Sequence, residues 1–425
     1  MCSSDLLGLP AMPEPTSETP ILDLQVPLSL RESMPRLLWW QGLLLGIGIS
    51  AVEVLVACFA LYIFDPHSCR FIEKLGGEHL RAIIDSVNRY VAPLFFLAIV
   101  ATLFFTITLH EVGHFVAAML VGFDVKVPVL GPIALSKAGS RVSFGVRRRD
   151  GTFGFMGVNL GIRGVRKLRR RLIFYVVSGP LADLISVSVV AVILGVDALR
   201  GLPAWFEAIM LLWGVVSGIQ LVGSLLIRSH DGVLLDGARL NMLTTSRKCT
   251  RRLICILAID ARRLAGYRPK TWKRTWVQAA ASGKDMTYDA FYGCWQAFAW
   301  ANDCEDSKKA GQYLEACLRN ARIAPKNFRE TLIAQASLFQ AWSRHDAEKA
   351  EKWLALVTSP TKLAPLDQIK VTVALRWAQN RIDEAFASWD EGLALIKALP
   401  VGSQEGSEQG WIEWKAKMDA RRPAS

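Results

Sequence analysis

The chain has 425 residues, of which 52% are hydrophobic, and it carries 50 Lys and Arg against 38 Asp and Glu, a formal net charge of +12. This composition is too apolar for an ordinary soluble enzyme of that length and favours a membrane protein. The positive charge would suit nucleic acid or an anionic membrane surface. Because the basic residues cluster beside apolar segments, we expect the lipid bilayer as the partner and no nucleic acid.

The first 30 residues contain five prolines and several acidic residues, without a basic start or a central apolar run. We therefore expect a flexible N-terminal tail over 1–35 rather than a cleavable signal peptide. A membrane domain is predicted over 36–244, because four apolar segments in it are long enough to span a bilayer, at 37–64, 91–121, 172–196 and 207–227. The alternative is that these segments are buried helices of a soluble core, and it fits the third segment best.

The loop between the second and third segments carries the strongest signal for orientation. Residues 141–171 hold ten Lys and Arg and one acidic residue, Asp150. By the positive-inside rule this loop is cytoplasmic, and the basic residues that follow the fourth segment agree. We therefore expect a multi-pass protein of the cell (inner) membrane with its N-terminus and C-terminal domain in the cytoplasm. This topology makes the 65–90 loop external, and its four basic residues argue against the predicted orientation of the first span.

The same loop carries a strand pattern. Apolar residues alternate with polar or small ones before and after an Asp150-Gly151 turn, which predicts a membrane-associated β-hairpin over 141–160. One interpretation is a surface hairpin whose arginines reach towards water. The other is a strand edge that binds an extended substrate segment through Val142, Phe144, Val146, Phe153 and Phe155.

From residue 245 the sequence changes to amphipathic helices with charged outer faces. A helix pair recurs at spacings of 35 to 42 residues, with a tryptophan before a polar turn and an alanine in the following helix: Trp300, Trp342 and Trp377, then Ala310, Ala350 and Ala385. This spacing predicts a cytosolic domain over 245–425 that is loosely similar to tetratricopeptide repeats, and a generic helical bundle is the alternative. The fold class is thus an all-α polytopic membrane protein with about four transmembrane helices, a small β-hairpin and a soluble C-terminal helical repeat-like domain.

The second apolar segment contains His110, Glu111 and His114 in the pattern HExxH. This spacing places both imidazoles on one face of a helix, where they can bind one zinc ion with the glutamate beside its open position. Ionisable side chains at membrane depth are functional by default, because leaving them unpaired in hydrocarbon costs several kcal/mol. The alternative is a helix-packing cluster that is satisfied by other polar groups.

A catalytic zinc ion needs a third protein ligand and one open position for water. Asp236 follows the fourth segment, and the predicted topology places it at the same edge of the membrane as the two histidines. His230 and Asp231 compete for this role, because they lie nearer to the end of the span.

These motifs resemble those of the site-two protease family of intramembrane zinc metalloproteases, which have HExxH in a transmembrane helix and a distal Asp-Gly, here in LLDGARL. The stretch SGPLAD at 178–183 is similar to a Gly-Pro-Leu-Ala-Asn stretch in the middle core helix of that family. The resemblance covers about 91–240. It implies a core of three helices, His110, His114 and Asp236 as zinc ligands, and Glu111 as the general base.

The resemblance also implies that Gly237 lets the chain approach the metal closely and that the 141–160 element receives the substrate strand. Two features depart from the family pattern. Asp183 replaces the usual Asn, and Ser-Leu-Leu-Ile at 224–227 replaces the Asn-Leu-x-Pro that commonly precedes the Asp-Gly.

The sequence therefore predicts a metalloprotease that binds one zinc ion and hydrolyses peptide bonds in or near transmembrane segments, in regulated intramembrane proteolysis. Its substrate would be a membrane protein, and the helical domain would recruit a protein partner or gate the site. Two alternatives fit the same residues. One is a non-catalytic membrane scaffold with a vestigial metal site, and the other is a zinc peptidase that acts on soluble peptides at the cytosolic face.

Overall fold

In a computed structural model of the chain, the structure describes residues 91–420 apart from short gaps at 131–132, 139–140, 147–153, 161–163, 196–203, 227–228, 231–232, 284, 286, 325, 359–362 and 399–400. The predicted N-terminal tail and first span lie outside these residues. The described part is mostly helical, in agreement with the predicted class, and holds thirteen α-helices, a four-stranded sheet and a two-stranded sheet.

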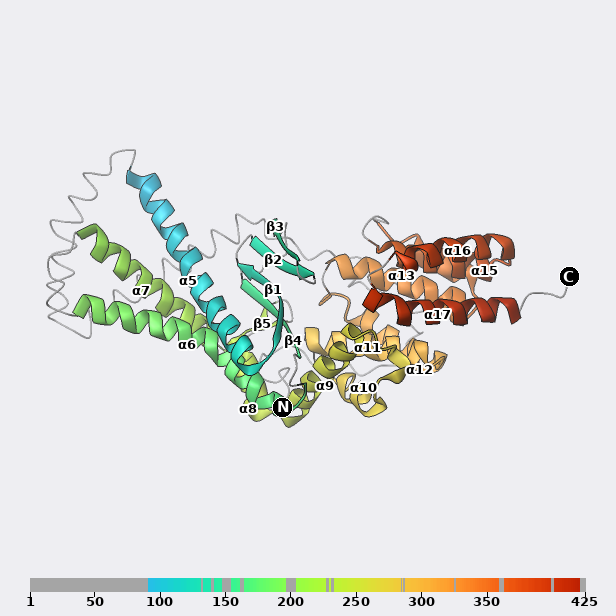
Figure 1. Ribbon diagram of the computed structural model, residues 1–425, viewed down its shortest axis with the longest axis horizontal. Helices are drawn as coiled ribbons and strands as arrows, with labels where there is room; N and C mark the ends of the chain where they lie inside the picture. The colour runs from blue at the N-terminus through green and yellow to red at the C-terminus, as the bar shows by residue number, and fades with distance from the viewer. Residues whose placement is uncertain are drawn as a thin grey trace.

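Three apolar helices coincide with the predicted second, third and fourth spans: α5 (Val91–Val121), α6 (Leu168–Gly195) and α7 (Ala204–Leu225). They pack on one another and extend as an arm away from the rest of the molecule (Figure 1). Two segments, Val100–Val121 and Leu168–Gly195, are long and apolar enough to cross a membrane, and Ile209–Leu225 is a shorter apolar helix.

The outer faces of these helices are apolar. Most of the exposed large hydrophobic side chains of the described residues lie on α5, α6 and α7, for example Phe105, Leu184 and Val222. A soluble core would bury such side chains, so these faces suit contact with lipid. This supports association with a membrane.

Helices α5 and α6 approach closely because small residues line their contact. A Cβ atom at Gly113 would lie 2.5 Å from the carbonyl oxygen of Ser178 on α6. At the far end of this contact the buried Arg171 donates hydrogen bonds to the carbonyl oxygens of Val121, at 2.9 Å, and Gly122, at 3.1 Å. Arg171 therefore caps the C-terminus of α5, where the last carbonyl groups of a helix lack partners.

The sequence between α5 and α6 forms a four-stranded antiparallel sheet of strand order β3-β2-β1-β4. Its strands are β1 (Asp124–Leu130), β2 (Ile133–Ala138), β3 (Arg141–Val146) and β4 (Gly154–Asn159). The predicted hairpin is wrong in its pairing, because β3 pairs with β2 and β4 pairs with β1. Only two residues separate β2 from β3 in the sequence, against seven between β3 and β4, and such a short separation favours antiparallel pairing of β3 with β2.

A short hairpin, β5 (Ser229–His230) and β6 (Val233–Leu234), follows α7 and leads directly into α8 (Asp236–Thr245). Helix α9 (Arg247–Leu264) starts after a single residue, Ser246, whose side chain caps it by accepting from the backbone N–H of Cys249. The predicted domain boundary at 244/245 falls at the end of α8. One hydrophobic cluster crosses this boundary, since it joins Ala118 and Leu172 to Leu243 and Leu253.

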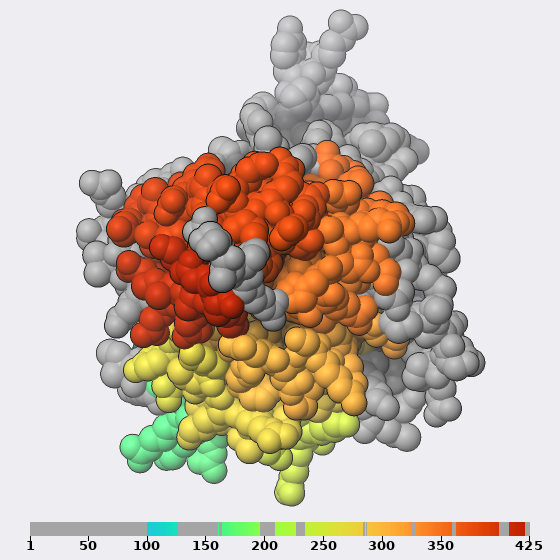
Figure 2. Space-filling model, turned by 90° about the vertical axis from the view of Figure 1, so that its right-hand side faces the viewer, coloured from blue at the N-terminus to red at the C-terminus, as the bar shows by residue number. Residues whose placement is uncertain are grey.

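The remaining helices lie within 245–425, the range of the predicted helical domain: η4 (Pro269–Thr271, a 3₁₀ turn), α10 (Arg274–Ala280), α11 (Tyr288–Asp303), α12 (Ser307–Arg319), α13 (Lys326–Ser343), α14 (Ala347–Leu354), α15 (Pro365–Ala378), α16 (Ile382–Lys397) and α17 (Val401–Ala420). Figure 2 shows this domain from its outer end, with the hairpins of α13 to α16 and helix α17 stacked on α9 to α12.

Three helical hairpins recur where the sequence predicts them, α11 with α12, α13 with α14, and α15 with α16. Each turn contains a residue of positive φ: Glu305, His345 and Asn380. Five residues after it, each second helix has an alanine that is 0% exposed: Ala310, Ala350 and Ala385. The alanines therefore share one register and let the paired helices approach. Trp300 does not share it, because it precedes its turn residue by five positions whereas Trp342 and Trp377 precede theirs by three.

Candidate metal centre

Helix α5 places the two histidines of HExxH side by side in its C-terminal half. His110 and His114 are 7% and 5% exposed, and their rings meet edge to face with centroids 4.9 Å apart. Glu111 is equally buried, at 8% exposed. Among the described residues its carboxylate forms no hydrogen bond, so it is available to accept a proton.

Asp236 completes the cluster from the first turn of α8. Its Oδ2 atom lies 3.1 Å from Nε2 of His110 and 3.3 Å from Nε2 of His114. The donor atoms of all three side chains lie within 4.8 Å of one another, which suits a single shared cation. Of the competing candidates, His230 lies in β5 and Asp231 lies outside the described residues.

Gly237 explains how Asp236 reaches this position. A Cβ atom at Gly237 would lie 2.1 Å from the carbonyl oxygen of Leu225, the last residue of α7. Only a glycine fits this contact without displacing one of the two helices. The start of α8 can thus rest against the end of α7 with the Asp236 carboxylate turned towards α5.

Helix α6 orients both imidazole rings through their other nitrogen atoms. Nδ1 of His110 lies 2.7 Å from Oδ2 of Asp183, and Nδ1 of His114 lies 2.7 Å from the carbonyl oxygen of Tyr175. Both partners accept hydrogen bonds, so each Nδ1 carries the proton and each Nε2 is left with a lone pair. A carboxylate or carbonyl behind the ring is the usual support of a histidine that binds a metal.

The residues fit a divalent ion of the zinc type. Two imidazole nitrogens and one carboxylate oxygen converge on one point, which is the three-ligand set of catalytic zinc sites. For this set to hold a metal ion, Asp236 has to be ionised and both Nε2 atoms have to keep their lone pairs. At these distances the lone pairs of the two Nε2 atoms and of the Asp236 carboxylate repel one another, and a cation bound between them would remove this repulsion.

Gly179 on α6 has no side chain, and this leaves room for the three candidate ligands. A Cβ atom at Gly179 would lie 2.4 Å from Nε2 of His114 and 2.6 Å from Nε2 of His110, the two nitrogens that face Asp236. Any larger residue at this position of α6 would fill the centre of the cluster. Pro180, which follows it, has no N–H to donate to the preceding turn of the helix.

Sequence reasoning names His110, Glu111, His114 and Asp236, and the structure brings these four residues together. It misses the roles of Asp183, which appears only as a departure from a family pattern, and of Gly179. An acidic residue inside an apolar helix is the signal that could have found Asp183.

Four of the five candidate substrate-binding residues lie in the sheet. Val142, Phe144 and Val146 belong to β3, and Phe155 belongs to β4, at the two opposite edges of the sheet. Phe153 lies outside the described residues. The sheet itself lies beside the end of α5, since β1 and β4 both contact that helix.

Comparison of the chain with family models, curated proteins and solved structures found no match. The geometry of the cluster therefore carries the functional argument.

Proposed function

We propose that this chain is an intramembrane zinc metalloprotease that hydrolyses peptide bonds in or near the transmembrane segments of membrane proteins. The observation that carries the proposal is the convergence of His110, His114 and Asp236, from two helices distant in sequence, on one point beside Glu111. The convergence lies in a bundle of apolar helices, where three such groups would otherwise be costly. The resemblance of HExxH and the distal Asp-Gly to the site-two protease family supports the same assignment.

His110, His114 and Asp236 would hold the ion. When bound there, zinc supplies a water molecule of lowered pKa and polarises a peptide carbonyl. Glu111 acts as the general base: its carboxylate takes a proton from the attacking water as the new C–O bond forms. The same carboxyl then gives that proton to the leaving amine when the C–N bond breaks. Asp183 and the carbonyl of Tyr175 keep both imidazoles in the orientation that this requires.

The position of the cluster defines the class of substrate. It is buried among helices whose outer faces are apolar, so a substrate segment would reach it from the bilayer. A transmembrane helix has all its backbone groups hydrogen-bonded and has to unwind before hydrolysis. The outer strands of the described sheet, β3 and β4, would supply backbone partners for the unwound segment. We further propose a multi-pass protein of the cell (inner) membrane, with the cluster near the cytosolic side.

The substitution Glu111→Gln tests the proposal. The full chain, purified in detergent, is incubated with a labelled single-span peptide whose span contains helix-breaking Gly and Pro residues, and separately with casein as an unfolded soluble protein. The wild type is expected to cleave the single-span peptide. E111Q should bind the same amount of zinc and lose at least about 100-fold in rate, the order expected when a general base is removed.

Three outcomes would overturn the proposal. Cleavage by E111Q at the wild-type rate would exclude Glu111 as the base. Cleavage of neither substrate by the zinc-loaded wild type would favour the scaffold alternative. Cleavage of casein alone would favour a zinc peptidase that acts on soluble polypeptides.

A further inference from the structure

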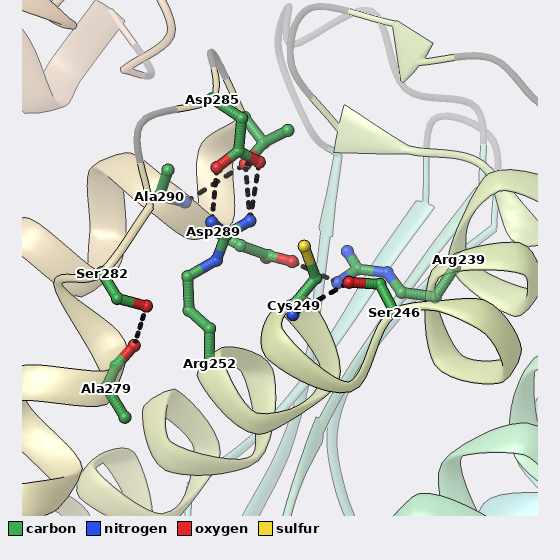
Figure 3. Close-up of polar contacts among 10 residues, drawn as sticks. Arg239, Ser246, Cys249, Arg252, Ala279, Ser282, Asp285, Asp289 and Ala290 are labelled. Atoms are coloured by element: carbon green, nitrogen blue, oxygen red, sulfur yellow. Dashed lines mark hydrogen bonds and ion pairs between the residues drawn. The ribbon is translucent and has the colours of Figure 1, made fainter. Parts of the chain in front are cut away.

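Helix α8 carries a second charged residue, Arg239, three positions after the candidate ligand Asp236. Residues three apart on a helix lie on neighbouring parts of its surface. While Asp236 faces the histidines of α5, Arg239 reaches to the helical domain, where its Nη1 atom lies 2.5 Å from Oδ2 of Asp289 (Figure 3). The same short helix thus connects the candidate metal centre to α11.

The ion pair between Arg239 and Asp289 is largely shielded from water. The side chains of Arg239 and Asp289 are 20% and 11% exposed. Ion pairs of this kind are screened less by salt than surface pairs, and loss of one partner leaves the other charge poorly solvated. Asp289 also lies in the first turn of α11, where a negative charge is stabilised by the helix dipole.

A second ion pair fixes the segment that precedes Asp289. Arg252 of α9 donates to Asp285, with Nη2 at 2.7 Å from Oδ2 (Figure 3). The Thr287 hydroxyl donates to the same carboxylate at 2.9 Å. Thr287 in turn caps α11 by accepting from the backbone N–H of Ala290. The start of α11 is therefore held on α9, and Arg239 meets a stationary partner.

Contacts with α6 and α7 hold α8 from the side opposite the helical domain. Leu243 is fully buried in the hydrophobic cluster with α5 and α6, and Arg169 donates to the carbonyl oxygens of Leu243 and Thr244 at the end of α8. These contacts act on the last turns of α8, and at its start Gly237 lies against the carbonyl oxygen of Leu225 on α7. Arg239 is the other charged residue of α8, and its partner belongs to the helical domain.

We propose that the helical domain positions Asp236 through the ion pair between Arg239 and Asp289, so that metal affinity depends on the placement of α11. Asp289 is a positioning residue, since it acts through α8 and touches none of the three candidate ligands. The inference rests on the proposed function only in taking Asp236 as a metal ligand. It gives the helical domain a specific regulatory role, because a partner that shifts α11 would weaken the metal centre.

The test is the zinc affinity of the full chain in detergent, measured by competition with a chromophoric chelator. Asp289→Ala and Arg239→Gln are each expected to weaken zinc binding about five- to tenfold, at the low end of couplings between separate sites. The double variant should be no weaker than either single variant, because both remove the same interaction.

Asp303→Ala is the matched control. Asp303 is the last residue of the same helix, α11. Its ion-pair partner is Arg268, which does not belong to α8. Its loss should lower the thermal stability of the protein and leave zinc affinity unchanged.

Three results would overturn the coupling. They are wild-type affinity in both single variants, effects that simply add in the double variant, or an equal loss of affinity in Asp303→Ala. His114→Ala, measured in parallel, shows whether the proposed coupling or the proposed metal centre has failed. If His114→Ala also binds zinc like the wild type, or if the wild type binds none, the metal centre itself is excluded.

Discussion

Asp183 on α6 accepts a hydrogen bond from Nδ1 of His110 on α5 at 2.7 Å, although the two residues are 73 positions apart in the sequence. Asp183 is 0% exposed, and its second oxygen, Oδ1, has no hydrogen-bond partner among the described residues. A buried carboxylate is retained only where it is paired. Here its partner is one of the two imidazoles of the candidate metal centre.

The substitution Asp183→Ala is expected to weaken zinc binding about 10- to 100-fold, the usual effect of losing a hydrogen-bond partner behind a ligating histidine. Asp183→Asn should retain most of the affinity, because its amide oxygen can still accept from Nδ1. Zinc titration of the purified variants measures both effects. Ser186→Ala is the control, since Ser186 is buried on the same helix and its hydroxyl donates to the carbonyl oxygen of Ala182. Equal losses in D183A and S186A would contradict a specific role for Asp183.

The substitution Gly179→Ala should abolish zinc binding without unfolding the protein. The new methyl group would lie against Nε2 of both histidines, whereas alanine is a better helix former than glycine. Metal content and thermal unfolding, measured on the same sample, separate the two effects. Gly218→Ala on α7 is the control, because nothing lies within 4 Å of its added Cβ atom. A G179A protein with a full complement of zinc would show that the site lies elsewhere.

The buried ion pair between Arg252 and Asp285 should make stability depend on pH in the acid range. Burial raises the pKa of Asp285, but the hydrogen bonds and charge of Arg252 outweigh this and the pKa is below its ordinary value. The stabilisation is therefore complete above the unfolded pKa of about 3.9 and is lost as pH falls towards the lower folded pKa.

Asp285→Ala should cost about 3–5 kcal/mol at pH 7, because it leaves the guanidinium of Arg252 buried and unpaired. Thermal unfolding of wild type and variant at pH 7 and pH 3 checks this. The difference between them should shrink at the lower pH. A difference that is the same at both values would show that this ion pair does not stabilise the fold.

Local patterns in the sequence predict the parts of the structure that local physics determines. Each apolar helix is found where a long apolar run occurs, because no other backbone arrangement satisfies such a run. The HExxH spacing requires only that α5 be a helix. The alanines at 310, 350 and 385 are predicted in the same way, since only small residues fit where paired helices touch.

Contacts between distant segments could not be predicted in this way. The alternation at 141–146 and 154–159 identifies strands, but the choice of partner depends on β1 and β2, which the sequence analysis did not recognise. Asp183 reaches His110 because α6 crosses α5 at this point. Gly179 matters because the same crossing brings it against both histidines. The number of membrane crossings predicts that Asp236 lies on the side of the histidines, but it allows His230 and Asp231 as well. The resemblance of the Asp-Gly motif to that of the site-two protease family selected Asp236.

The most direct test of the metal centre is the zinc content of the purified full-length chain, measured by elemental analysis for the wild type, His114→Ala and Asp236→Ala. We expect one zinc ion per wild-type chain and nearly complete loss in both variants, with thermal stability close to that of the wild type without metal. A wild-type protein that contains no zinc after incubation with it, or a D236A protein that retains a full equivalent, would contradict the assignment.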